Sequence, residues 1–245
     1  MLNALYLVWA IFWVVIGFII TMPINLIFLS FKRTYFIGHF LRKLWAYIIF
    51  LPIGMWVTVS GKEHVKGLNQ FIYAPNHSSY IDIPASTIAL PGILCYMAKD
   101  ELTKFPIFGY FFKTIDIGVK RGNARKAYEA FIEIGDRLNT GQIPLIFPEG
   151  TIPAKSPHLG NFKIGAFRLA IEKQVPIVPV TMLDNAARFP EQKPLVGRPG
   201  RMRVIIHRPI STTNLKSDDA EMLKMKVYRI IEQTLLKHQI ISNEN

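Results

Sequence analysis

The chain has 245 residues, of which 50% are hydrophobic and 19% are charged, and its formal net charge is +12. This length fits one domain with an appendage, and the apolar content excludes a disordered chain. The single cysteine, Cys95, excludes a disulfide framework and a cysteine-rich zinc site. The basic balance indicates an anionic partner, and a nucleic acid is one such partner on charge alone.

The N-terminal part of the chain differs in charge from the rest. Residues 1–62 hold five basic and no acidic residues, whereas residues 63–245 hold 24 basic and 17 acidic ones. Residues 4–28 are apolar over a length that crosses the hydrocarbon core of a bilayer as a helix. A buried core helix is the alternative, but such helices rarely lack a polar face over so long a span. We expect a membrane-embedded helical motif over residues 1–62 and a separate folded domain over residues 63–245.

A second apolar stretch covers residues 44–60, but it is short, and Pro52 and Gly54 interrupt it. The basic residues before it are Lys32, Arg33, Arg42 and Lys43. The positive-inside rule places this basic segment, and the domain that follows, on the cytoplasmic side of a membrane. We expect a half-inserted or interfacial helix and then a strand near residues 55–60, rather than a second span.

Strand-like and helix-like patterns alternate along the second part of the chain, which predicts an α/β fold. The expected strands are residues 71–74, 93–97, 143–147, 177–182 and 202–207, with a possible further strand at 114–119. The expected helices are residues 81–90, 123–139, 163–173 and 218–239. Residues 184–201 are expected to form a long polar loop.

The first polar motif, Asn76-His77-Ser78-Ser79-Tyr80-Ile81-Asp82, follows an expected strand directly. A carboxylate can hold one nitrogen of a histidine ring while the other nitrogen takes a proton. A turn between strand and helix would let Asp82 fold back onto His77. The alternative is a surface histidine near an aspartate that complements a helix dipole.

A second motif, Phe147-Pro148-Glu149-Gly150-Thr151, also follows an expected strand. Glycine permits a close approach of the backbone, where N–H groups can hold an anion or a hydroxyl. Glu149 could accept a hydrogen bond from a substrate alcohol. An ordinary strand-ending turn is the alternative interpretation.

Two cations complete the set of candidates. Lys99 closes one expected strand, and Arg121 precedes an expected helix, where a guanidinium can bind a phosphate. A solvated surface position is the usual alternative for both. The sequence contains no nucleophile elbow, P-loop or Rossmann glycine pattern. If His77 is a base, the nucleophile therefore belongs to the substrate, which favours an alcohol of a phosphorylated lipid attacking an activated acyl group.

In their order along the chain, these motifs resemble the 1-acyl-sn-glycerol-3-phosphate acyltransferases of the glycerolipid acyltransferase family. The resemblance covers about residues 55–210. Its matching blocks are residues 76–82, 99–109, 117–121, 147–151 and 175–180. One position departs from the family pattern: Ile152 stands where an arginine usually follows the threonine, with Lys155 three residues later.

The resemblance implies an N-terminal two-helix membrane motif and an α/β domain with a mixed sheet flanked by helices. It also implies acyl transfer from acyl-CoA or acyl carrier protein to the sn-2 hydroxyl of lysophosphatidic acid, giving phosphatidic acid without a metal or cofactor. His77 would be the general base, and Asp82 would orient it. The implied residues that bind or shape the acceptor region are Asn76, Lys99, Arg121, Glu149, Gly150 and Thr151.

Two alternatives stay open at this point: another lyso-lipid acceptor, or a non-catalytic membrane-anchored lipid-binding protein. A nucleic-acid partner is disfavoured, because basic and aromatic residues do not interleave on any one expected helix. The C-terminal part of the chain also contains a basic cluster, which would face anionic headgroups, CoA phosphates, an acidic carrier protein or only solvent. Its members are Arg188, Lys193, Arg198, Arg201, Arg203 and Arg208.

Overall fold

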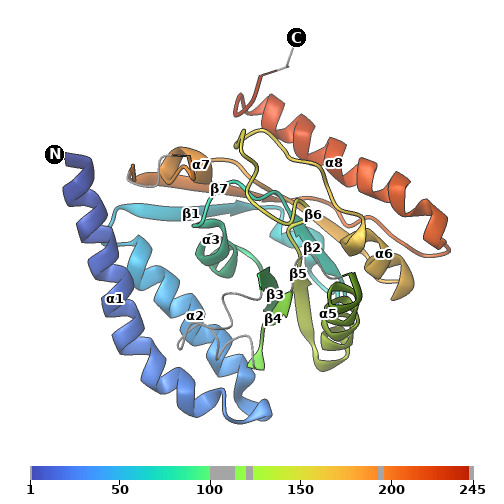
Figure 1. Cartoon of the computed structure of the whole chain (residues 1–245), viewed down its shortest axis with the longest axis horizontal. Coiled ribbons are helices and arrows are strands. Elements are labelled where there is room, and N and C mark those ends of the chain that lie inside the picture. Colours follow the sequence, from blue (N-terminus) through green and yellow to red (C-terminus); the bar gives the residue numbers. More distant parts are fainter. Residues whose placement is uncertain (1, 100–113, 120–123, 193–195, 243–245) are drawn as a thin grey trace.

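The computed structural model describes residues 2–99, 114–119, 124–192 and 196–242. A seven-stranded sheet lies at its centre, in the order β1-β7-β6-β2-β5-β3-β4 (Figure 1). The strands are β1 (Met55–Ser60), β2 (Ile72–Pro75), β3 (Ile93–Lys99), β4 (Ile117–Val119), β5 (Gln142–Leu145), β6 (Ile177–Met182) and β7 (Gly200–Ile206). The helices are α1 (Leu2–Phe28), α2 (Tyr35–Phe50), α3 (Asp82–Ala89), α5 (Ala124–Arg137), α6 (Gly165–Glu172), α7 (Asn185–Arg188) and α8 (Ala220–Lys237).

The sheet is mixed. Strands β6 and β7 pair antiparallel, whereas β1 pairs with β7, and β2 with both β5 and β6, in parallel. Strands β5, β3 and β4 continue the parallel part to the other edge. The central strands are apolar on both faces because helices cover both faces, as is usual for parallel sheets. The predicted α/β fold with a mixed sheet flanked by helices is confirmed.

Helices α5, α6 and α8 cover one face of the sheet, and α3 covers the other, with α2 and α1 outside it (Figure 1). On the first face, Ile134, Phe167 and Val227 pack against strand residues such as Ile72. On the second face, Tyr73 and Leu94 pack beneath α3. Alternate residues of the strands therefore point to opposite faces of the sheet and contribute to separate hydrophobic cores.

Helices α1 and α2 form an antiparallel pair, here called the hairpin, which packs against α3 (Figure 1). Within the described residues, Ala4–Phe28 is the one segment long and apolar enough to cross a membrane. The exposed large apolar side chains of α2 are Phe36, Phe40, Leu44 and Tyr47. Gly17 lets the helices approach, because a Cβ there would lie 2.7 Å from the Trp45 indole.

Helix α2 differs from the expected helix in its limits. It begins at Tyr35 and ends at Phe50, so Arg42 and Lys43 lie inside the helix rather than in front of it. The expectation failed because it treated every cation as a flanking charge. Arg42 is buried and is neutralised by an ion pair with Asp116, so it does not interrupt the apolar helix.

Two further boundaries differ from the sequence patterns. Residues 184–201 were expected as a long loop, but they include the short helix α7 and the start of β7. The predicted strand near residues 55–60 is confirmed as β1, but it pairs with β7 over its whole length and is part of the sheet rather than of the N-terminal motif. The sheet edge therefore follows directly from the hairpin through the turn at residues 51–54.

The core beneath α8 provides a test of this packing. Ile231 is fully buried against the sheet side of α8, whereas Met222 on the same helix is 57% exposed. We expect Ile231→Ala to lower the free energy of unfolding by about 2–5 kcal/mol, because the cavity it leaves cannot collapse fully. Met222→Ala is the matched control and should leave the thermal midpoint nearly unchanged in a detergent-solubilised sample. Equal shifts for the two variants would contradict the burial of this face.

Candidate active site

Both polar motifs lie at the same edge of the sheet. Strand β2 ends at Pro75, and β5 runs beside it, with Ile146 N–H donating to Tyr73 O at 3.0 Å. The carboxyl ends of parallel strands open at one edge, where ligands bind in α/β proteins. The loop after β2 carries His77, and the loop after β5 carries Glu149. The fold thus brings together two motifs that are 72 residues apart.

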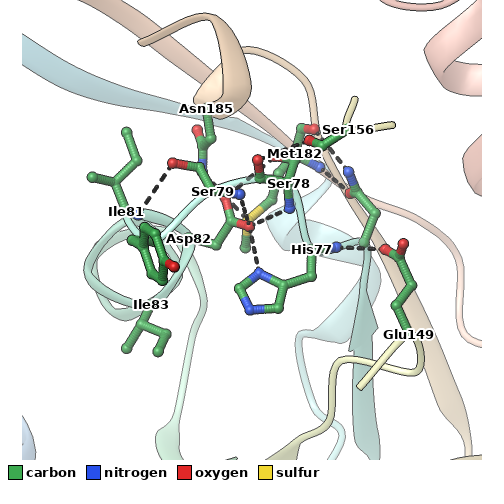
Figure 2. A network of polar contacts seen from close by, with 12 residues as sticks. His77, Ser78, Ser79, Ile81, Asp82, Ile83, Glu149, Ser156, Met182 and Asn185 are labelled. Carbon is green, nitrogen blue, oxygen red and sulfur yellow. Dashed lines mark hydrogen bonds and ion pairs between the residues drawn. The ribbon is translucent and has the colours of Figure 1, made fainter. Parts of the chain in front are cut away.

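His77 and Asp82 point toward one another across the turn that leads into α3 (Figure 2). The distance from His77 Nδ1 to Asp82 Oδ2 is 2.8 Å. An ionised carboxylate only accepts hydrogen bonds, so Nδ1 carries the proton and Nε2 presents a lone pair. No hydrogen-bond partner of Nε2 is found in the part of the chain that the structure describes. The imidazole is thereby prepared to accept a proton at Nε2.

Asp82 is fully buried, and its carboxylate is surrounded by donors. Oδ2 also accepts the N–H groups of Ser78 at 2.6 Å and Ser79 at 2.9 Å. Oδ1 accepts the Asn185 amide at 2.6 Å. These bonds stabilise the ionised carboxylate in a place where an isolated charge would be costly. The sequence reasoning missed Asn185, because no spacing pattern connects it with a residue 103 positions earlier.

The ring of His77 is held on its face as well as at its nitrogen. It stacks on Phe147, with ring centroids 4.1 Å apart and an interplanar angle of 23°. Phe147 belongs to the second motif, two residues before Glu149. The imidazole is therefore fixed by one group from each motif, which restricts the direction in which Nε2 can receive a proton.

Glu149 connects the two motif loops through backbone groups. Its Oε1 accepts the His77 N–H at 2.7 Å, and its Oε2 accepts the Gly160 N–H at 2.7 Å. The side chain is buried, and this burial raises the pKa of the carboxyl group to about 7, against the opposing effect of the two amide bonds. Both oxygens are thus engaged with the protein, so Glu149 shapes the loop that carries His77.

The other candidate residues near the two motifs differ in burial and in their contacts. The Asn76 side chain is buried and joins β2 to β6, donating to Met182 O and accepting from Met182 N–H. Gly150 has φ +70°, and a Cβ there would meet the Lys163 side chain at 2.8 Å. Thr151 is exposed, whereas Ile152 is buried. The departure from the family pattern therefore places an apolar side chain in a core position.

Of the two cations predicted to bind phosphate, the structure describes the backbone position of Lys99 only. Lys99 is the last residue of β3, and it is paired in register with Val119 of β4. Arg121 lies outside the described residues. Because β3 and β4 run parallel, the ends of both strands open at the same edge as the His77 loop.

An apolar cavity of about 410 Å³ lies between α1, α2 and the start of α3. Ala10, Val14 and Phe18 line it from α1, and Tyr80 and Ile83 line it near the His77 turn. Its polar lining residues include Arg42, Tyr96 and Asp116. Among the residues that the structure places, no group of three or more His, Cys, Asp or Glu side chains could hold a metal ion.

Comparison with known proteins assigns the chain to a family. Residues 56–183 match the family described as Acyltransferase, so the chain belongs to the acyltransferase family. It is 30% identical over 194 residues to 1-acyl-sn-glycerol-3-phosphate acyltransferase LPAT1, chloroplastic, of Arabidopsis thaliana, covering 78% of this chain and 53% of that protein. It is 32% identical to 1-acyl-sn-glycerol-3-phosphate acyltransferase alpha of Ovis aries, covering 76% and 65% respectively.

The fold also matches a solved structure. The crystal structure of the 1-acyl-sn-glycerophosphate (LPA) acyltransferase PlsC from Thermotoga maritima superposes with a TM-score of 0.77 at 21% identity, covering 99% of this chain and 97% of that one. The likeness includes the hairpin, since it extends over nearly the whole chain. The chain spans about half the length of the Arabidopsis relative, 53%.

The raised pKa of Glu149 predicts a pH effect on stability. Its carboxyl group has a folded pKa of about 7 against an ordinary value of 4.5, so the folded state holds this proton more strongly. The resulting stabilisation is complete below about pH 4.5 and is lost as the pH rises through about 7. We expect Glu149→Gln to remove this part of the pH dependence when thermal midpoints are compared from pH 4.5 to 8.

The exposed Glu133 offers the matched control for that measurement, because its side chain is 57% exposed. Glu133→Gln should keep the pH dependence of the unmodified protein. A Glu149→Gln curve parallel to the unmodified curve across this range would show that Glu149 does not titrate there.

Proposed function

We propose that the protein transfers an acyl group from a thioester donor, acyl-CoA or acyl carrier protein, to the sn-2 hydroxyl of lysophosphatidic acid, forming phosphatidic acid. The observation that carries this proposal is the 2.8 Å contact between His77 Nδ1 and a buried Asp82, with Nε2 left to accept a proton. The names of the relatives support the same acceptor. The protein is thereby proposed as a 1-acyl-sn-glycerol-3-phosphate O-acyltransferase.

In the proposed reaction, His77 Nε2 takes the proton of the acceptor hydroxyl as its oxygen attacks the thioester carbonyl. Asp82 stabilises the imidazolium that forms. When the tetrahedral intermediate collapses, the carbon–sulfur bond breaks, and the thiolate leaves with the proton from the imidazolium. General acid–base catalysis of this kind typically contributes about 10²–10⁴-fold to the rate.

Acceptor binding is assigned to the edge formed by β3, β4 and the motif loops. Lys99 and Arg121 would bind the phosphate of lysophosphatidic acid. Lys99 is the last residue of β3, and Arg121 follows β4, the strand that pairs with β3. Gly150 and Thr151 would line the glycerol region, and Glu149 would shape it through its bonds to His77 and Gly160. Asn76 would contribute by fixing the start of the His77 turn.

The hairpin is proposed to embed in the lipid without carrying the chain fully across it. Its outer face is apolar, with Ile19, Ile27 and Phe40 more than half exposed. Its inner face packs against α3 and β3 of the catalytic domain, so a full crossing would bring the sheet into the hydrocarbon. We therefore infer a half-inserted hairpin, with membrane lipids around it and the catalytic domain on the cytoplasmic face.

The first prediction of this proposal concerns the base itself. His77→Ala should reduce turnover of lysophosphatidic acid with an acyl-CoA donor by about 10²–10⁴-fold, because the variant lacks the imidazole that is proposed to accept the proton of the hydroxyl. His238→Ala at the end of α8 is the matched control and should retain activity. Circular dichroism checks that both variants keep the fold. Full turnover by His77→Ala would contradict the proposed mechanism.

The second prediction concerns the acceptor. A matrix of acyl-CoA and acyl carrier protein donors against charged and neutral lyso-lipids should show the highest kcat/KM with lysophosphatidic acid. Arg121→Ala should raise the KM for lysophosphatidic acid more than for a monoacylglycerol, which has no phosphate, because it removes a phosphate-binding cation. Turnover of neutral acceptors alone would exclude the phosphate role of Arg121 and favour a different lyso-lipid substrate.

A further inference from the structure

A buried ion pair joins the hairpin to the sheet at a distance from the His77 turn. Arg42 of α2 is 7% exposed, and Asp116, just before β4, is 5% exposed. Arg42 Nη1 donates to both Asp116 oxygens, at 2.9 and 2.8 Å. Arg42 Nη2 donates to the carbonyl oxygen of Leu94 in β3 at 2.7 Å. One guanidinium therefore fixes α2 against two neighbouring strand segments.

Tyr96 of β3 is the next member of this network. Its N–H donates to Asp116 Oδ1 at 2.9 Å, and the Arg42 guanidinium lies 4.7 Å from the centroid of its ring. Its hydroxyl oxygen lies 2.8 Å from Ser86 Oγ and 2.7 Å from Thr87 Oγ1. Tyr96 thus contacts the ion pair with its backbone and ring, and contacts α3 with its hydroxyl.

The contacts on α3 converge near the catalytic turn. The hydroxyls of Ser86 and Thr87 both donate to the carbonyl oxygen of Ile83, at 2.8 and 3.0 Å. Ile83 directly follows Asp82, the first residue of α3 and the partner of His77. A continuous series of polar contacts therefore runs from the hairpin to the first turn of α3, the helix that begins with Asp82.

We propose that Tyr96, held by the Arg42–Asp116 ion pair, is a positioning residue that sets α3, and with it Asp82 and His77, relative to the hairpin. This inference rests on the proposed function, because it requires His77 to be the base. Stability alone explains the ion pair poorly, since desolvation offsets much of the attraction and an apolar pair of similar volume would hold α2 equally well. Directional bonds add a fixed orientation that apolar contacts lack.

The test replaces the group of this polar network that contacts α3, the Tyr96 hydroxyl. Tyr96→Phe keeps the ring and removes only the hydroxyl, so the core stays filled. We expect kcat for lysophosphatidic acid to fall about tenfold, with KM changed by less than about twofold, because small misplacement of a catalytic group costs rate more than affinity. Hydrogen exchange of the amides in residues 83–90 should become faster in the same variant.

Tyr73→Phe is the matched control. Tyr73 is also buried in the sheet, and its hydroxyl donates to the carbonyl oxygen of Pro91, beyond the end of α3, at 3.3 Å. This variant loses one hydroxyl of the same kind but no contact with the first turn of α3. It should keep the kcat of the unmodified enzyme and the exchange rates of residues 83–90.

A second variant tests the ion pair without leaving one buried charge unpaired. Arg42→Met combined with Asp116→Leu should fold and should show a loss in kcat similar to that of Tyr96→Phe. Adding Tyr96→Phe to this pair should cause little further loss, because all three residues act through one route.

The inference and the proposed function fail in different ways. The inference is overturned if Tyr96→Phe matches Tyr73→Phe in both kcat and hydrogen exchange. It is also overturned if the kcat losses of Tyr96→Phe and of the Arg42→Met, Asp116→Leu pair add in the triple variant. The proposed function is overturned by unmodified protein without turnover of lysophosphatidic acid, or by His77→Ala with full activity. Since the inference needs an active His77, either of those results removes it as well.

Discussion

The buried carboxylate of Asp82 is the group on which the rest of the site depends. A charge removed from water must be compensated, and here donors come from the His77 ring, the turn that follows β2, and Asn185 of α7. The first two donors lie within five residues of Asp82, whereas Asn185 lies 103 residues away along the chain. The position of α7 above the sheet and the shape of the turn between β2 and α3 are therefore both constrained by one negative charge.

The second motif acts on the same histidine through its backbone. Glu149 accepts the His77 N–H and the Gly160 N–H, so the loop after β5 and the loop after β2 share one side chain. Phe147 adds a stacked face to the imidazole. The ring is thus positioned by groups from the segments that follow β2 and β5, which are adjacent because these two strands pair in the sheet. Such support from neighbouring residues is what the proposed base needs for a fixed orientation.

Patterns within short stretches of sequence predicted the α/β class and the contact between His77 and Asp82. The alternation of apolar strands and amphipathic helices was sufficient for the α/β class, and the short spacing from His77 to Asp82 was sufficient for their contact. Asn185 and the pair of Arg42 and Asp116 could not be predicted, because each contact joins residues from distant segments and has no periodic signal. Arg42 also misled the prediction of α2, since a buried cation and a flanking cation look alike in a sequence.

The close approach of α1 to α2 at Gly17 has a consequence for the cavity beside them. A side chain at that position would collide with the Trp45 indole, which also lines the cavity, so any separation of the two helices would alter the cavity walls at the same time. The spacing of α1 from α2 therefore sets the width of the cavity and the thickness of the hairpin together. With the hairpin in lipid, as proposed, lateral pressure would act on both, since the outer apolar side chains of α1 are exposed.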